Sequence, residues 1–333
     1  MRNLHKAALA LVLFATPALA DDCKPLTLIT TIDLKTDKEH DAVFAPVTLD
    51  GKNELLQVDT GGAFSELTRE TADDLKLDRE PVNVGVIDVN GQISYEAGRV
   101  KSAMLGNLHV SDMDFIIAHY NPFGDGNTEI AGILGPDILM NYDTEFDFGT
   151  DKMTLLSPDH CPGKVIYWPA DAVAMVPIKV AAHGHITFPV TLDGKQITAM
   201  LDTGASETTV RTLTAESVFG LTPTSPGMSA VGSLSDKTHG AAVQHHKFKT
   251  LSFGDPNGAN ITVGNPEADI VPDEMSGDPR NENRTGTRLA SKHEEVGLPD
   301  MLLGMNILKH LHIYIAYGEQ RLYITPASAP AKP

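Results

Sequence analysis

Residues 46–61 read PVTLDGKNELLQVDTG, and residues 189–204 repeat most of that stretch as PVTLDGKQITAMLDTG. The first seven letters are identical at an offset of 143 positions, and the closing Asp-Thr-Gly keeps the same offset. By average residue usage, a given Asp-Thr-Gly arises by chance in about one chain in ten or twenty of this length. Two copies in register with a longer repeat therefore indicate a chain built from two homologous halves.

A second shared element lies later in each half. Residues 131–139 read AGILGPDIL, and residues 302–308 read LLGMNIL. From the Asp of the repeat to the Gly of this element, the first half spans 76 residues and the second half 102, a difference of 26. We expect the extra residues in a long surface insertion at about 254–299, a polar stretch with little periodicity.

Around these motifs the pattern is one of strands and turns. Runs 44–49 and 186–192 are rich in β-formers and end at Asp-Gly, which predicts hairpins whose return strands deliver the Asp-Thr-Gly motifs. Another hairpin is expected around Asn90-Gly91. Helices are expected to be short, at 68–77, at 212–219 and after the two shared Gly residues. The sequence therefore predicts an all-β chain with two lobes.

The first residues have the pattern of an export signal. Arg2 and Lys6 precede an apolar stretch that is too short to span a bilayer, and Ala18-Leu19-Ala20 resembles a cleavage site. The alternative is a buried N-terminal helix, which this pattern favours less. We expect a signal peptide at 1–20 and an exported protein, periplasmic or secreted.

Export would affect the expected oxidation state of the two cysteines. Cys23 and Cys161 are the only cysteines and lie 138 residues apart. In an oxidising compartment, such a pair favours one disulfide over two free thiols. The bond would connect the N-terminal strand to the end of the first half.

The Asp-Thr-Gly motifs can carry acid–base chemistry. A single copy is most simply a hairpin tip. If the two halves pack about a pseudo-twofold axis, however, Asp59 and Asp202 meet and share one proton. Such a pair can activate a water molecule and protonate a leaving nitrogen without a metal or another cofactor; aspartic proteases are the known example of this shared proton.

The motifs resemble those of the retropepsin/pepsin clan of aspartic proteases. Residues 200–206, MLDTGAS, are similar to the retropepsin active-site loop, and the hydrophobic-hydrophobic-Gly elements at 132–135 and 302–304 are similar to the segment crossing behind that loop. The resemblance covers roughly residues 40–326. It implies two tandem psi-type β-barrel lobes with short helices, related by a pseudo-twofold axis around a cleft for an extended peptide.

The resemblance also implies residue roles. Asp59 and Asp202 would be the catalytic pair, and the hairpin at Asn90-Gly91 is the candidate flap. The equivalent region of the second half, 232–238, is either a second flap or only a loop. Gly62 departs from the Ala or Ser usual in the family, whereas Ala205 fits. The residues implied to support the active-site loops are Thr60, Gly61, Thr203 and Gly204. The implied domains are an N-terminal lobe at 21–162 and a C-terminal lobe at 163–326. The composition of the last residues, rich in Pro and Ala, predicts a flexible tail at 327–333.

Other functions are weighed by composition and spacing. The chain has 333 residues, a formal net charge of −18 and no basic cluster, which argues against nucleic-acid binding. The tightest histidine clusters, 183–185, 245–246 and 310–312, each lack an identifiable third ligand, so scattered histidines are favoured over a metal site. The sequence also lacks the Gly-x-Ser-x-Gly motif that would indicate a serine hydrolase.

Two alternatives stay open at this point. The chain could be a peptide-binding or scaffold protein that keeps the aspartic protease fold without turnover, because fold does not fix function. Each half could also dimerise with a half of another chain. The tandem order and matched halves favour a monomer that acts as an internal pseudo-dimer. The partner expected for it is an extended peptide or unfolded protein.

Overall fold

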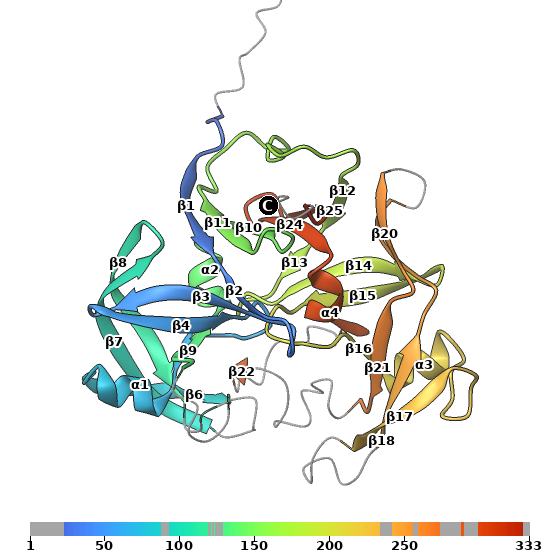
Figure 1. Ribbon diagram of the computed structural model, residues 1–333, viewed down its shortest axis with the longest axis horizontal. Helices are drawn as coiled ribbons and strands as arrows, with labels where there is room; N and C mark the ends of the chain where they lie inside the picture. Colours follow the sequence, from blue (N-terminus) through green and yellow to red (C-terminus); the bar gives the residue numbers. More distant parts are fainter. Residues whose placement is uncertain are drawn as a thin grey trace, which may run out of the picture.

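The computed structural model consists of two β-sheet lobes joined by a third sheet (Figure 1). The first half of the chain, blue to green, lies on the left of Figure 1, the second half lies on the right, and the joining sheet lies above and between them. This arrangement confirms the predicted all-β, two-lobed fold. The structure describes residues 23–87, 93–118, 121, 123, 129–233, 242–255, 259–273, 288–289 and 299–328.

The first lobe is built on a nine-stranded sheet with the strand order β2-β3-β4-β9-β5-β8-β7-β6-β22, whose last strand comes from the second half of the chain. The elements of this lobe are β2 (Lys35–Asp37), β3 (Ala42–Leu49), β4 (Lys52–Val58), β5 (Glu66–Leu67), α1 (Arg69–Asp74), β6 (Arg79–Ile87), β7 (Ile93–Leu105), β8 (Leu108–Ile117), β9 (Gly132–Leu134), α2 (Pro136–Leu139) and β22 (Arg288–Leu289).

The second lobe repeats this plan in a ten-stranded sheet with the path β17-β18-β21-β16-β23-β15-β14-β19-β20, to which β13 adds beside β14. Its elements are β13 (Lys179–Val180), β14 (Ile186–Leu192), β15 (Lys195–Leu201), β16 (Thr209–Arg211), α3 (Thr212–Ser217), β17 (Met228–Ser233), β18 (Ala242–Lys247), β19 (Thr250–Gly254), β20 (Asn260–Gly264), β21 (Glu267–Val271), β23 (Met301–Leu303) and α4 (Met305–Leu308).

The repeated Asp-Gly pairs make the hairpin turns that the sequence predicted. Asp50 and Gly51 have φ angles of 45° and 85°, and Asp193 and Gly194 have 45° and 76°. Two successive positive φ angles are typical of a type I′ turn, which suits Asp-Gly and matches the twist of the flanking strands. Each return strand, β4 or β15, then pairs in parallel with β9 or β23, so the two shared motifs of each half lie side by side.

A six-stranded sheet joins the lobes, with three strands from each half of the chain. Its order is β1-β11-β10-β24-β25-β12, so the halves meet at the antiparallel β10–β24 ladder. That ladder pairs Thr144 with Ile315 and Asp147 with His312. The strands are β1 (Leu28–Asp33), β10 (Asp143–Asp147), β11 (Lys152–Leu156), β12 (Ala174–Pro177), β24 (Leu311–Ala316) and β25 (Arg321–Pro326).

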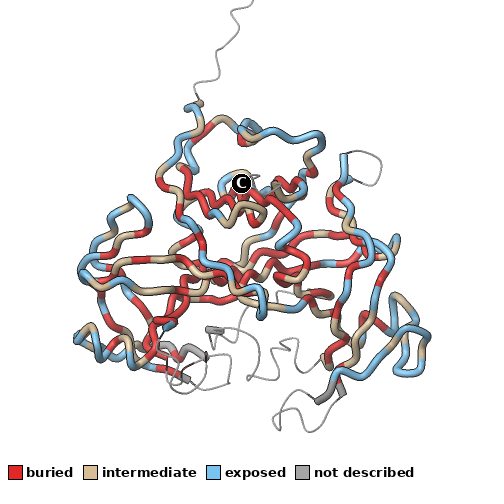
Figure 2. The backbone as a smooth tube through the Cα atoms, in the orientation of Figure 1, coloured by how far each residue is buried: buried red, intermediate tan, exposed pale blue. Residues whose placement is uncertain are grey.

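Hydrophobic burial follows the strand period. In β3, Val43, Ala45, Val47 and Leu49 are buried, whereas the residues between them are only partly buried, because alternate side chains of a strand point to opposite faces. All six residues of β24 are buried. Figure 2 shows buried backbone concentrated along the sheets, while the outer turns are exposed. The dense core therefore runs from both lobes into the sheet that joins them.

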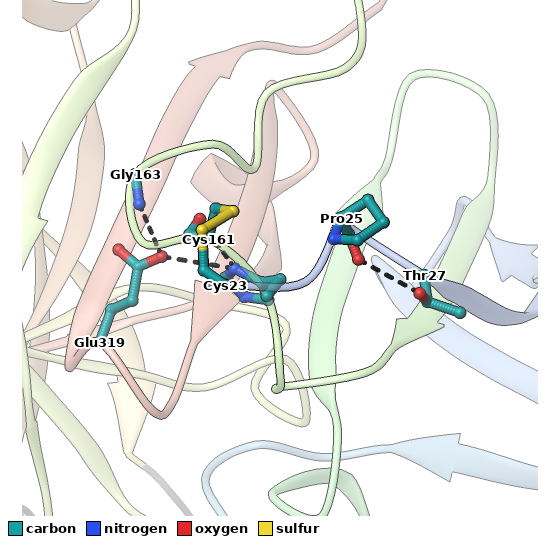
Figure 3. The surroundings of a disulfide bond; sticks show 7 residues. Cys23, Pro25, Thr27, Cys161, Gly163 and Glu319 are labelled. Carbon is teal, nitrogen blue, oxygen red and sulfur yellow. Dashed lines mark hydrogen bonds and ion pairs between the residues drawn. A yellow bond between two sulfur atoms is a disulfide. The ribbon is translucent and has the colours of Figure 1, made fainter. Parts of the chain in front are cut away.

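Cys23 and Cys161 form a disulfide (Figure 3). The bond lies at the start of the described chain, and the backbone N–H of Cys161 also donates to the carbonyl of Lys24 at 2.8 Å. The disulfide closes a 138-residue separation and holds the segment leading into β1 against the end of the first half. Closing so long a loop restricts the unfolded chain, which on a chain-entropy model stabilises the fold by roughly 2–5 kcal/mol.

Two buried histidines pair with acidic residues of β10 in the joining sheet. His160 Nε2 is 2.6 Å from Asp143 Oδ2, and His312 Nε2 is 2.7 Å from Glu145 Oε1. The side chains of these four residues are at most 6% exposed. The sequence predicted scattered surface or partly buried histidines, and for His312 this was wrong. Its ring stacks on Trp168 at a centroid distance of 4.0 Å, directly on the contact between the halves.

Stability is expected to fall as the pH rises past the titration of His160. Burial lowers the pKa of His160, but its hydrogen bonds to Asp143 and to the Cys161 carbonyl outweigh burial and raise the pKa above 6.5. Protonated His160 therefore stabilises the fold fully below pH 6.5, and this contribution is lost as the pH rises through the raised pKa. Burial also raises the pKa of Asp143, which acts in the same direction at lower pH.

Thermal unfolding from about pH 6 to pH 9 tests this expectation, with a predicted fall in Tm of a few degrees. His160→Gln should flatten the profile. His40→Gln is the matched control, because His40 is also paired with a carboxylate, Asp37, but is exposed. A His160→Gln profile as steep as that of the unchanged protein would contradict the assignment.

The long insertion differs from the expectation. The segment 254–299 was expected to be an unpatterned surface loop, but it begins with two strands of the lobe sheet, β20 and β21. The β-formers Ile261, Thr262 and Val263 were overlooked among polar neighbours. In the first half residues 118–131 separate β8 from β9, whereas residues 272–300, which include the short strand β22, separate β21 from β23. Most of the extra length therefore lies after β21.

The ends of the chain add two findings. Residues 327 and 328, expected in a flexible tail, are held by hydrogen bonds: Ala327 N–H donates to the His310 carbonyl at 2.9 Å, and Ser328 N–H to Asp147 Oδ1 at 3.4 Å. The predicted signal peptide and residues 329–333 lie outside the described residues. Among the residues that are described, no helix has the length and apolarity needed to cross a membrane.

Candidate active site

The two Asp-Thr-Gly loops meet between the lobes. Asp59 follows β4 directly, and Asp202 follows β15. The backbone N–H of Asp59 donates to the Leu134 carbonyl at 3.0 Å, and that of Asp202 donates to the Leu303 carbonyl at 3.1 Å. Leu134 and Leu303 are the last residues of β9 and β23, the parallel partners of β4 and β15. Each hydrophobic-Gly motif therefore holds the neighbouring Asp-Thr-Gly loop in place.

Backbone amides hold both carboxylates in matching ways. Asp59 Oδ1 accepts from the N–H groups of Gly61 and Gly62, at 2.8 and 2.9 Å. In the second half, Asp202 Oδ1 accepts from the two equivalent residues of its own loop, at 2.9 and 3.1 Å. Gly62 contacts Asp59 through its backbone N–H, so having glycine in place of the usual Ala or Ser leaves this hydrogen bond intact.

The two carboxyl groups also share a hydrogen bond and influence one another's ionisation. Burial raises the pKa of Asp59 above its ordinary value, against the opposing effect of the Gly61 amide. Burial and the neighbouring charge of Asp59 raise the pKa of Asp202 well above its ordinary value. Two buried carboxyls in contact cannot both ionise cheaply, so ionisation of one disfavours ionisation of the other.

Gly61 and Gly204 are required by space. A Cβ on Gly61 would lie 2.2 Å from Cγ of Asp202, and a Cβ on Gly204 would lie 2.4 Å from Cγ of Asp59. The sequence-based explanation was that glycine permits a sharp turn, but neither residue has a positive φ angle. Glycine is needed at each position because the carboxyl group of the opposite loop approaches closely. The same requirement holds in both halves.

Thr60 and Thr203 connect the two loops through four hydrogen bonds. The Thr60 hydroxyl accepts from the Thr203 N–H at 3.1 Å and donates to the Leu201 carbonyl at 3.1 Å. The Thr203 hydroxyl accepts from the Thr60 N–H at 3.1 Å and donates to the Val58 carbonyl at 2.8 Å. Both threonines are 1% exposed. The loops are therefore bound to each other through the residues that directly follow the two Asp residues.

Removing one of these hydroxyls is expected to destabilise the fold. Thr60→Val keeps the shape but leaves the buried Thr203 N–H and Leu201 carbonyl without partners, at a cost of about 2–4 kcal/mol. Thr60→Ser keeps the hydroxyl and should cost less than about 1.5 kcal/mol for the lost methyl group. Urea unfolding at equilibrium distinguishes the two. Equal losses in Val and Ser variants would show that packing, not the hydrogen bonds, matters at this position.

Five further side chains around the site were missed from the sequence. Gln57 Nε2 donates to a carbonyl of the opposite loop at 3.1 Å. Ser65 bonds to Asp137, and Thr208 bonds to Asn306, in the same arrangement. The sequence did contain a signal for the equivalence of Ser65 and Thr208, because the two residues lie at the offset of 143 that relates the motifs. It was overlooked because only identical residues were compared.

The candidate flap can be placed only at its base. Strands β6 and β7 pair antiparallel, but Asn90 and Gly91, which the sequence predicts between them, lie outside the described residues. In the second half β17 and β18 form the matching hairpin, and most of 232–238 also lies outside the described residues. Where the structure describes side chains, no group of three or more His, Cys, Asp or Glu could hold a metal ion.

Comparisons with known proteins agree with this architecture. A family model described as aspartyl protease matches residues 45–138 and 188–307. A comparison with curated proteins gives no match.

Two solved structures resemble the chain. The aspartic proteinase from Irpex lacteus is 11% identical with a TM-score of 0.51, over 90% of this chain and 98% of that one. Basic 7S globulin from soybean is 11% identical with a TM-score of 0.50, over 92% of this chain and 96% of that one. At such identity the likeness shows the fold alone.

Proposed function

Since the chain belongs to the aspartyl protease family, we propose that it is an aspartic endopeptidase in which Asp59 and Asp202 activate a water molecule. The observation that carries the proposal is the reciprocal approach of the two loops, in which each glycine leaves room for the opposite carboxyl group. Family membership alone would be compatible with a fold that has lost its activity.

The chemistry follows from the shared proton. The ionised member of the pair takes a proton from a bound water, while the protonated member donates to the carbonyl oxygen of the peptide. The resulting tetrahedral intermediate collapses when the pair returns a proton to the leaving nitrogen. The amides of Gly61 and Gly62, with their equivalents around Asp202, keep the carboxyl groups oriented throughout. The substrate is an extended peptide or an unfolded protein.

Three further parts belong to this proposal. We propose a boundary between the lobes at residues 162 and 163, which lie within the segment 157–173 that connects β11 of the first half to β12 of the second. The protein works as a monomer, since one chain supplies both carboxyl groups. It is exported, periplasmic or secreted, as the signal pattern at 1–20 and the disulfide support.

Digestion of a peptide library by the purified protein lacking residues 1–20 tests the proposal. We expect internal cleavage that persists in the presence of a metal chelator and of serine-directed reagents, because neither a metal nor a serine nucleophile takes part. Binding of library peptides without any cleavage would instead identify the chain as a peptide-binding protein with this fold.

A further inference from the structure

A matching clamp lies behind each Asp-Thr-Gly loop. In the first half, the N–H and the hydroxyl of Ser65 both donate to Asp137 Oδ1, at 2.8 and 2.7 Å. In the second half, the N–H and the hydroxyl of Thr208 both donate to Asn306 Oδ1, at 3.0 and 2.7 Å. The two clamps have the same connectivity, and each begins six residues after an Asp of the pair.

The clamps differ in charge. Asp137 is a carboxyl group that also accepts from the N–H of Ile138 at 3.0 Å, whereas Asn306 is a neutral amide. Asn306 Nδ2 additionally donates to the Glu267 carbonyl at 3.1 Å, a bond that an ionised carboxylate cannot make. The internal repeat therefore places an ionisable group behind Asp59 where the second half has a neutral one behind Asp202.

Each clamp connects directly to the backbone that holds its Asp. The Ser65 hydroxyl accepts from the Gly135 N–H at 2.9 Å. Gly135 follows Leu134, whose carbonyl accepts the Asp59 N–H. The same path exists in the second half, where the Thr208 hydroxyl accepts from a glycine N–H at 3.0 Å. One hydroxyl group and one peptide unit thus separate Asp137 from the backbone of Asp59.

We propose that Asp137 is a positioning residue that makes the two members of the acid pair unequal. Its carboxylate holds the Asp59 loop through Ser65 and places a negative charge behind Asp59, where the second half offers the neutral Asn306 behind Asp202. A nearby negative charge disfavours ionisation of the pair, so Asp137 raises the pH at which the pair loses its first proton. This inference rests on the proposed function, because it assigns a role within that same site.

The surroundings of Asp137 define which other groups titrate beside it. Its hydrogen-bond donors are Ser65 on the Asp59 loop and Ile138 on its own helix. From the second half, the hairpin between β13 and β14 approaches α2, where a Cβ on Gly184 would lie 2.3 Å from Cβ of Pro136. His183 and His185 are the titratable residues of that hairpin. Burial raises the pKa of Asp137 against the opposing hydrogen bonds of Ser65.

Exchange of the two residues between the halves tests the inference. The carboxyl carbons of Asp59 and Asp202 would be titrated by NMR in the full mature chain carrying Asp137→Asn, Asn306→Asp, or both. Asp137→Asn should lower the apparent pKa of the pair by about half a pH unit, and Asn306→Asp should raise it by a similar amount. In the double exchange the two shifts should largely cancel. His183→Gln and His185→Gln serve as controls for the neighbouring hairpin.

Opposite shifts from the two single exchanges would support the inference, and the acid limb of any cleavage profile should move in the same directions. Unchanged pKa values in both singles, or shifts of equal sign, would overturn it. Asp137→Asn should fold, since Asn306 already fills that place in the second half; if it does not, Asn306→Asp alone decides. Because the NMR titration needs no turnover, an inactive chain would refute the proposed function and leave this test intact.

Discussion

Asp59→Asn and Asp202→Asn are each expected to lower the rate of peptide cleavage by about 10³-fold to 10⁴-fold. An amide can neither take a proton from water nor hold the proton that the pair shares, so one substitution removes the function of both carboxyl groups. The amide oxygen can still accept the hydrogen bonds that Oδ1 receives from the loop amides. Removing a potential charge from a buried site should leave the free energy of unfolding unchanged or slightly increased.

Steady-state cleavage of one library-derived peptide, with urea unfolding of each variant, measures both quantities. Asp171→Asn is the control, because Asp171 is exposed in the segment between β11 and β12. It should retain full activity. Full activity in either the Asp59 or the Asp202 variant would refute the shared-proton mechanism, even if the other variant were inactive.

Gly61→Ala and Gly204→Ala are expected to abolish cleavage and to destabilise the fold by about 2–4 kcal/mol each. The added methyl group would lie within 2.5 Å of at least two atoms of the opposite carboxyl group, so that carboxyl must leave its position. Displacing it also breaks the hydrogen bonds from its own loop amides. The loss should thus appear in activity and in stability together.

Gly264→Ala is the matched control for these two variants. A Cβ on Gly264 would meet nothing within 4 Å, and its φ angle is not positive. Its free energy of unfolding should change by less than about 0.5 kcal/mol, as for an ordinary surface substitution. Retention of cleavage in Gly61→Ala would show that the carboxyl groups work at a greater separation than the structure gives.

The repeat made much of the site predictable from the sequence. An exact offset of 143 residues relates Asp59 to Asp202 and fixes which turns and strands are equivalent. Hairpins were predictable because Asp-Gly is one of few pairs that adopt two positive φ angles at low cost. Such turns depend only on adjacent residues. The bounds of β3, β4, β14 and β15 could therefore be predicted to within a few residues.

The joining sheet was not predictable in the same way. Its central ladder pairs residues such as Thr144 and Ile315, and nothing local to either strand identifies its partner. The burial of His312, which lies in that ladder, follows from the pairing, so it could not be inferred from spacing. Asp137 was quoted within a shared motif, but its importance depends on a contact with Ser65, 72 residues away.

The central ladder of the joining sheet has a consequence for the order of folding during synthesis. β10 is made early, but its partner β24 is the second-to-last strand to be made. Until the ribosome has released almost the entire polypeptide, β10 presents an unpaired edge, and such edges recruit strands from other molecules. A chain of this design gains from being kept unfolded until its synthesis is complete, because only then are both sides of the ladder present at once.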